Sequence, residues 1–218
     1  MTKDKIDPCA TIEGESKDQP DIRLGALLDI AAEVFVSEGF EAASVGEIAR
    51  RAKASKQTIY LHYPSKAELF QAVITWRVDA TYCRIASLLI SDDPPQKALM
   101  TFGAGLLDMV LEASAVGLLR LVYMESRRFP QLGELIYNQG AGRGLAKLES
   151  YIRKQRDLGR LRVEDTEIAA EQFLDMITGR LLMRAALGVA PNPSQRDKKS
   201  RVKAAVDVFL AAYGCEKG

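Results

Sequence analysis

The sequence predicts an all-α protein with an N-terminal helix-turn-helix domain of three helices and a longer helical C-terminal domain. Apolar residues recur at helical spacing along most of the 218 residues. No segment shows the alternating pattern of a strand, a hairpin signal or an internal repeat. A short stretch, Ser44–Lys66, also has the spacing and turn residues of two short helices joined by a tight turn.

The stretch Ser44–Lys66 is the part of the chain that the rest is expected to support. Ser44 and Glu47 have the spacing of a capping box at the start of its first helix. Ser55 is placed to cap a second short helix in which Ile59 points inward and polar side chains point outward. A short polar helix on a compact support suits reading of the DNA major groove. The apolar stripe of the first helix consists of Val45, Ile48, Ala49 and Ala52.

Charge is distributed unevenly, although the whole chain is nearly neutral with 30 basic and 29 acidic residues. Residues 44–66 carry five basic side chains and one acidic side chain, Glu47, whereas residues 21–43 carry five acidic side chains and one basic one. A local basic patch of this kind is typical of a nucleic-acid contact. An ordinary solvated face is the alternative that charge alone leaves open.

The flanking segments read as support and connection. Residues 1–20 are polar and are expected to form a disordered tail. A helix is expected over 21–38, ended by Gly39 in a left-handed conformation, with Phe40 folded back on Phe35. Ser65 and Glu68 have capping-box spacing at the start of a long helix that reaches about residue 90.

The remainder reads as one helix after another. Pro and Gly residues mark the breaks, and the glycines of Gly140–Gly144 are expected to separate two helices. This glycine run follows a helix rather than a strand and lacks the Lys-Ser/Thr ending of a phosphate loop, so a nucleotide site is not expected. The expected helices span 96–112, 116–128, 131–139, 145–157, 166–187 and 194–213.

Composition argues against most enzyme chemistries. His62 is the only histidine and the three cysteines are scattered without a CxxC pair, so neither a metal cluster nor a Ser/His catalytic arrangement is expected. We therefore predict no catalytic residues, no metal and no cofactor, with an enzyme on a helical scaffold as the remaining alternative. Neither a secretory signal nor a membrane-spanning run is visible, which predicts a cytoplasmic protein without a membrane partner.

The helix-turn-helix stretch resembles the DNA-binding domain of the TetR/AcrR family of transcriptional regulators. Segments LRLVYMESRRFPQLGELIYNQG and EIAAEQFLDMITG are similar to the C-terminal domain of the AefR-like branch. The resemblance implies a DNA-binding domain over 21–66 and an effector-binding and dimerisation domain over 67–218. It implies a homodimer, paired through the helices 166–187 and 194–213, that acts as a repressor and leaves a palindromic operator when a small, largely apolar molecule binds. The residues matching the family run are Ser44, Val45, Ile48, Ala49, Ala52, Ser55, Lys56, Thr58, Ile59, Tyr60, Tyr63, Ser65, Lys66 and Leu69.

The resemblance also implies which residues meet DNA. Three positions depart from the usual run: Lys53 and Gln57 stand where glycine is frequent, and His62 stands where a tyrosine is frequent. If the position of Lys53 requires positive φ, a side chain there is strained by about 1 kcal/mol. The alternative for Ser44 and Thr58 is a capping role, and for Tyr60 partial burial. The expected DNA contacts are Ser44, Ser55, Lys56, Gln57, Thr58, Tyr60, His62, Tyr63 and Lys66.

An effector cavity is expected among Met and aromatic side chains, which adapt to varied apolar shapes. Each of these side chains is alternatively plain core. Arg180 and Arg184 either bind an anionic ligand or pair with acidic groups of a second subunit. A DNA-binding protein controlled by a protein partner, or by no ligand, is the alternative function. The expected cavity residues are Phe102, Leu106, Met109, Tyr123, Met124, Tyr137, Phe173 and Met176.

Overall fold

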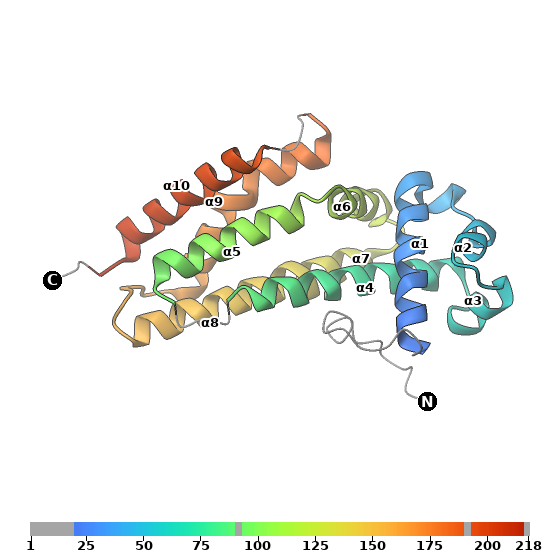
Figure 1. Ribbon diagram of the computed structural model, residues 1–218, viewed down its shortest axis with the longest axis horizontal. Helices are drawn as coiled ribbons and strands as arrows, with labels where there is room; N and C mark the ends of the chain where they lie inside the picture. Colours follow the sequence, from blue (N-terminus) through green and yellow to red (C-terminus); the bar gives the residue numbers. More distant parts are fainter. Residues whose placement is uncertain (1–19, 90–92, 190–192, 216–218) are drawn as a thin grey trace. The chain divides into compact units, whose positions relative to one another are not determined.

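The computed structural model describes residues 20–89, 93–189 and 193–215, so the predicted tail lies outside the described residues apart from Pro20. The described part is helical, which confirms the all-α prediction, and its one extended feature is an isolated bridge between Leu161 and Gly214 (Figure 1). The elements are α1 (Pro20–Ala42), α2 (Val45–Arg51), α3 (Lys56–His62), α4 (Lys66–Ser87), α5 (Pro95–Val110), α6 (Ala113–Glu125), α7 (Pro130–Glu134), the π-helix η2 (Leu135–Gly142), α8 (Arg143–Asp157), α9 (Thr166–Leu187) and α10 (Gln195–Tyr213).

The chain divides into two compact units. The first unit contains the described residues up to Cys83 together with Gly117–Gly140. The second unit contains the described residues of Arg84–Val116 and Ala141–Gly218. The first unit therefore holds α1–α3 and most of α4, and the second holds α5 and α8–α10.

Four phenylalanines form the aromatic centre of the first unit. The ring of Phe40 lies 5.1 Å from that of Phe70 and 5.0 Å from that of Phe129, and Phe35 lies 5.0 Å from Phe70. The predicted contact of Phe35 with Phe40 is present, with ring centroids 6.1 Å apart. Gly39 has the expected positive φ of 79°, but a further helical turn follows it, so α1 extends to Ala42 as a kinked helix. The non-helical backbone at Gly39 confirms the predicted end of the first straight segment at residue 38, and the buried Phe40 lies in the short helical segment beyond the kink.

Serine side chains begin the next three helices. The oxygen of Ser55 accepts a hydrogen bond from Thr58 N at 3.0 Å, and that of Ser65 accepts one from Glu68 N at 3.1 Å. Ser44 caps α2 as predicted, but its partner is Gly46 N at 3.2 Å. The predicted capping box with Glu47 is therefore wrong, because the Glu47 carboxylate is held by the guanidinium of Arg50 at 2.7 and 2.8 Å.

In the second unit, α10 packs on α5 and α9, and α8 packs on α9 (Figure 1). Gly103 permits the close approach in α5: a Cβ there would lie 2.7 Å from Val202 Cγ1 and 2.9 Å from Ile177 Cδ1. At the surface, the Lys198 ammonium donates to the Asp108 carboxylate at 2.8 Å, which lowers the pKa of Asp108. The largest fully buried side chains of this unit are Leu99, Phe102, Leu107, Phe173 and Phe209.

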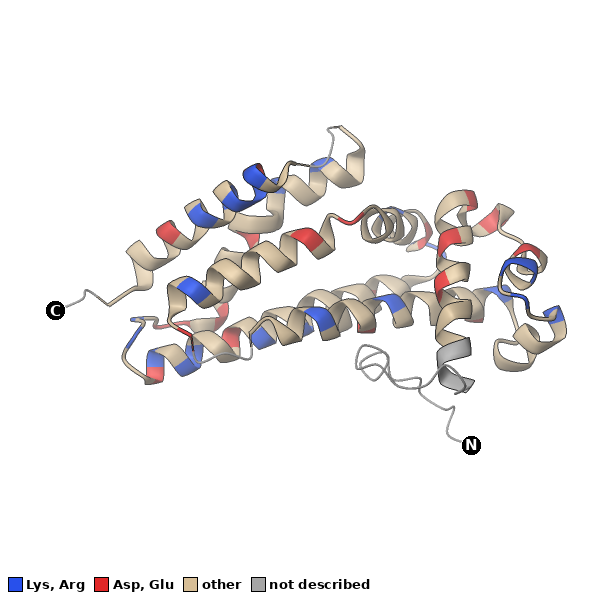
Figure 2. Ribbon diagram, viewed as in Figure 1, with Lys and Arg blue, Asp and Glu red and all other residues tan. Residues whose placement is uncertain are grey.

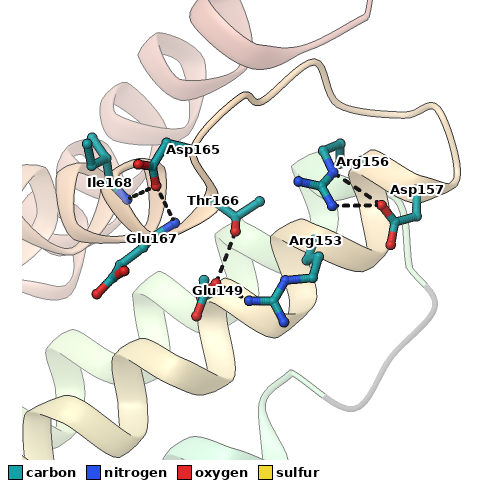
Figure 3. Close-up of polar contacts among 8 residues, drawn as sticks. All are labelled: Glu149, Arg153, Arg156, Asp157, Asp165, Thr166, Glu167 and Ile168. Carbon is teal, nitrogen blue, oxygen red and sulfur yellow. Dashed lines mark hydrogen bonds and ion pairs between the residues drawn. The ribbon is translucent and has the colours of Figure 1, made fainter.

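Polar contacts hold the start of α9 against α8 (Figure 3). The Asp165 carboxylate accepts hydrogen bonds from Glu167 N and Ile168 N, both at 3.0 Å, and so caps the helix. The Thr166 hydroxyl donates to Glu149 Oε1 at 3.0 Å, and Arg153 of α8 binds the same carboxylate. These contacts fix the position at which α9 begins.

The glycines of Gly140–Gly144 do not separate two helices. They lie in η2 and at the start of α8, within a run that is helical from Pro130 to Asp157. The prediction of a break here is wrong because wider π-type turns let the backbone pass through the glycines without leaving the helix.

No single helix among the described residues is both long and apolar enough to cross a membrane, although α5 and α6 taken together pass that test as a bent pair.

We predict that Lys53→Gly stabilises the protein. Lys53, in the turn between α2 and α3, has φ 51° and is the non-glycine residue with positive φ in the described chain. Glycine relieves a left-handed strain of about 1–2 kcal/mol and loses about 0.5–1 kcal/mol through its freer unfolded state, so the free energy of unfolding should rise by about 0.5–1 kcal/mol. Urea unfolding measures this difference.

The matched control is Lys154→Gly, an exposed lysine near the end of α8. Glycine inside a helix should lower the free energy of unfolding by about 1 kcal/mol. Equal destabilisation by both substitutions would show that Lys53 is not strained.

Candidate nucleic-acid interface

Helix α3 exposes nearly its whole surface. Ile59 is its one buried side chain, at 1 % exposure, and it belongs to the core of the first unit. Lys56, Gln57 and Thr58 are exposed, and so is His62 at the other end. One apolar anchor therefore leaves the remaining side chains of α3 available to a partner.

The three hydroxyl side chains of the predicted interface already have local roles. Ser55 caps α3 as predicted, and Ser44 caps α2, which is the alternative role given for it above. Thr58, for which a capping role was the other alternative, lies inside α3. The Thr58 hydroxyl lies 2.8 Å from the Ser55 hydroxyl, so these two share a hydrogen bond. A serine or threonine oxygen has both a donor and two acceptor positions, so these contacts leave capacity for a phosphate oxygen.

Basic residues lie on α2 and at the start of α3, whereas α1 carries several acidic residues (Figure 2). The basic side chains differ in their partners. Arg50 is paired with Glu47, which lowers the pKa of that carboxyl mainly through their hydrogen bond. Arg51 is paired with Glu33 of α1. Lys53 and Lys56 are exposed and form no ion pair with any described residue. These two lysines carry the positive charge that is not neutralised locally.

Lys66 lies at the first position of α4 and makes contacts that the sequence did not reveal. Its ammonium donates to the carbonyl oxygens of Glu41 at 2.9 Å and Ala43 at 3.2 Å. It also lies 4.8 Å from the centre of the Phe40 ring. Because an ammonium has three donors, one N–H remains for a phosphate. Lys66 thus ties the end of α1 to the start of α4.

The aromatic residues of the interface have different environments. Tyr60 is 45 % exposed, which leaves its ring and hydroxyl accessible. Tyr63 ends α3, packs against the core of the first unit, and has its pKa raised by burial. His62 is exposed beside it, with ring centroids 6.3 Å apart. Tyr60 and His62 are accordingly more open than Tyr63.

Leu61 is the residue of α3 that the sequence analysis did not single out. It is 80 % exposed, more than any other large hydrophobic side chain in the described residues. Its position two residues after the buried Ile59 places it on the opposite face of the helix. That spacing was visible in the sequence and could have identified it.

The residues predicted to line an effector cavity fall into two groups. Phe102, Leu106, Met109 and Phe173 are buried in the core of the second unit, and Met176 is half-buried against it. Tyr123, Met124 and Tyr137 belong to the first unit and are 64 %, 72 % and 73 % exposed.

Helix α9 carries charged and apolar side chains on its exposed surface. Arg180 and Arg184 are exposed and form no ion pair with the described residues. Ile168, Met183 and Leu187 are 49 %, 59 % and 68 % exposed on the same helix.

Two families match the chain over most of its length. Residues 27–73 match the bacterial regulatory proteins of the tetR family. Residues 97–215 match the C-terminal domain of AefR-like transcriptional repressors. The first match contains α2, α3 and the start of α4, and the second contains α5–α10 almost completely.

Curated relatives match this chain either over a short segment or over most of its length. Over 59 residues the chain is 51% identical to the transcriptional activator FasR of Mycolicibacterium smegmatis, a match that covers 27% of each protein. The first three curated relatives are matched over 27%, 25% and 18% of their own lengths. AcrR of Shigella flexneri is 28% identical over 86% of this chain and 87% of its own.

Solved structures show the same fold. A TetR-family regulator of Mesorhizobium loti superposes with a TM-score of 0.84 at 27% identity, covering 92% of this chain and 100% of that one. The flavonoid-responsive regulator FrrA superposes with a TM-score of 0.68 at 27% identity, covering 90% and 99%. The domain matches, the exposed helix α3 and these structures lead to one conclusion: the chain belongs to the TetR family of DNA-binding transcriptional regulators and is not an enzyme.

Proposed function

We propose that this regulator binds a roughly palindromic operator as a homodimer and leaves it when a small molecule binds. The observation that carries the proposal is the exposure of α3, anchored by Ile59 alone, beside the unpaired cations Lys53 and Lys56. A two-fold dimer sets two such helices about one DNA turn apart, which makes the operator palindromic. Because a bacterial operator lies in the cytoplasm, we propose that the protein acts there.

The proposed DNA contacts divide by chemistry. Gln57 and Tyr60 are exposed on α3 and suit base edges, where a glutamine amide can bind adenine in two places. The cations and hydroxyls suit phosphate oxygens, which position the protein without reading sequence. The residues proposed to contact phosphate oxygens are Ser44, Ser55, Lys56, Thr58, His62, Tyr63 and Lys66.

We propose that the second subunit covers the exposed faces of α9 and α10. Met183 and Leu187 on α9 and Val208 on α10 are 59 %, 68 % and 57 % exposed. Several large apolar side chains exposed on two neighbouring helices are typical of an interface that a partner buries. A four-helix bundle with the same helices of the partner would cover them. Arg180 and Arg184 then pair with acidic groups of the partner subunit.

A small molecule is the proposed effector of the domain formed by 67–218, while 21–66 form the DNA-binding domain. Phe102, Leu106, Met109, Phe173 and Met176 of the second unit supply apolar surface for it. The similarity to FrrA, a flavonoid-responsive regulator, supports control by a ligand. The effector must bind the DNA-incompetent state more tightly, because equal binding to both states changes nothing.

Repression is the proposed sign of regulation. The AefR-like repressor match covers residues 97–215, the part that responds to the effector. FasR is an activator, but its match is confined to 59 residues.

The second candidate is a regulator controlled by a protein partner or by no ligand. The burial of Phe102 and Phe173, both at 0 % exposure, favours this candidate, because such burial argues against a large open cavity in the second unit.

Selection from a random DNA library with the full-length protein tests the proposal. We expect enrichment of an inverted repeat whose half-sites are centred about one turn apart, bound by one dimer or two. Binding should weaken when the effector, found by screening small molecules for release of that DNA, is added. Enrichment of no sequence would contradict operator binding, and release by no ligand would favour the second candidate.

We predict that Lys56→Ala and Lys66→Ala have similar effects on DNA binding but different effects on stability. Both should weaken binding to all DNA sequences and lower the salt slope by about 1 per protomer, because each removes a phosphate contact. Lys66→Ala should also lower the free energy of unfolding by about 1–2 kcal/mol, since it removes two hydrogen bonds from a charged donor. Lys56 forms no ion pair with the described residues, so its removal should change the free energy of unfolding much less than that of Lys66 does.

Affinity measured against salt concentration, together with urea unfolding, checks both statements. An unchanged salt slope for Lys66→Ala at full affinity would remove Lys66 from the DNA contacts and leave only its structural role.

Val208→Glu should produce a monomer with poor operator affinity. The charge would face the apolar side chains of the partner's bundle helices and would cost several kcal/mol to bury. Leu158→Glu is the matched control, because Leu158 is 53 % exposed at the end of α8 and outside the proposed interface. Sedimentation should show monomers for the first variant and dimers for the second; an intact Val208→Glu dimer would rule out this interface.

A further inference from the structure

We infer that Leu61 reads a thymine methyl group in the major groove and so helps to set operator sequence; the inference rests on the operator binding proposed above. A thymine presents its 5-methyl group at the groove edge, and apolar side chains contact it. Leu61 is an apolar side chain 80 % exposed on the helix proposed to enter that groove.

The position of Leu61 on α3 supports this role. Ile59 is 1 % exposed and anchors the helix to the core. Residues two before and two after it project from the opposite face, and these are Gln57 and Leu61. Both are exposed, and they lie one turn apart on a single ridge. This ridge is the part of α3 farthest from its own core.

The surroundings of Leu61 distinguish it from an ordinary surface leucine. Single exposed hydrophobic residues are common on proteins and need no ligand. Leu61, however, lies in a helix of polar and charged side chains, where Tyr60 is 45 % exposed and Lys56 is an unpaired cation. An apolar side chain between groups suited to phosphate and base edges has one apolar target in the groove, the thymine methyl.

The ridge also predicts the spacing of the two bases. Residues four apart on a helix are separated by about 6 Å along its axis. Successive bases on a DNA strand rise by about 3.4 Å. A helix lying along the groove therefore places a base read by Gln57 within about two base-pair steps of the thymine that Leu61 contacts.

Removal of single methyl groups from the selected operator tests the inference. Replacing each dT in turn by dU removes the methyl and keeps the base pair. For the wild-type protein, one symmetric pair of positions should lower affinity about fourfold per half-site, the factor expected for one buried methyl group. Leu61→Ala should bind the dT operator correspondingly weakly and should be insensitive to dU at those positions.

Two further variants control the experiment. Leu61→Met keeps an apolar side chain of similar reach and should retain sensitivity to dU. Leu158→Ala removes a leucine that is 53 % exposed on α8 and should bind DNA like the wild type. Because both leucines are exposed, thermal unfolding of Leu61→Ala should match that of Leu158→Ala, so a failure to fold would be recognised.

The outcomes separate this inference from the proposed function. If wild type and Leu61→Ala lose equal affinity at every dU position, or if the selected half-site lacks a dT, operator binding stands and the inference is wrong. If selection enriches no sequence, operator binding fails and the inference fails with it. A dU effect present in the wild type and absent in Leu61→Ala supports the inference.

Discussion

The clamp between the end of α1 and the start of α4 is the constraint on which the helix-turn-helix depends. Phe40 contacts Phe35, Phe70 and Phe129, and Lys66 covers its ring while donating to Glu41 and Ala43 carbonyls. The carbonyls at the end of a helix lack helical partners, and a cation is favourable there. These contacts hold together the two ends of the segment that contains α2 and α3. The two short helices therefore need little packing of their own.

The contacts between the end of α1 and the start of α4 explain how α3 can be so exposed. A seven-residue helix with one buried side chain would not be stable alone, because isolated helices of this length are marginal in water. Ser55 caps it, Ile59 anchors it, and α2 supports it through a turn that forces Lys53 to φ 51°. The strain at Lys53 is retained at a site that keeps a positive charge beside α3. The protein can thereby expose the side chains of α3 without losing its core.

The second unit is stabilised differently, because its helices are long and extensively buried. Gly103 lets α5 approach α9 and α10 closely, and the Asp165, Thr166 and Glu149 contacts fix the start of α9. What this unit leaves uncovered is the outward surface of α9 and α10, with Met183, Leu187 and Val208 exposed. Rigid placement of these helices is what a bundle between two subunits requires.

The sequence by itself determined the helices, their breaks and the candidate recognition helix. Periodic apolar residues, proline breaks and serine caps are local signals, and they located α2, α3, α9 and α10 to within a residue or so. The resemblance also places glycine at the position of Lys53, and the structure gives this residue a positive φ of 51°. Local signals were misleading at the glycines of η2, where helical backbone continues through residues that usually end it.

Tertiary structure alone decided which partners the side chains have. Lys66 resembles a free phosphate ligand in the sequence, but it is held by the carbonyl oxygens of Glu41 and Ala43. Arg51 is neutralised by a residue of another helix, Glu33, whereas no described residue forms an ion pair with Lys53 or Lys56. Pairing across helices depends on distances that local sequence does not encode. Leu61 is different, because its spacing from Ile59 already placed it on the outer face of α3, and the folded chain added only the extent of its exposure, 80 %.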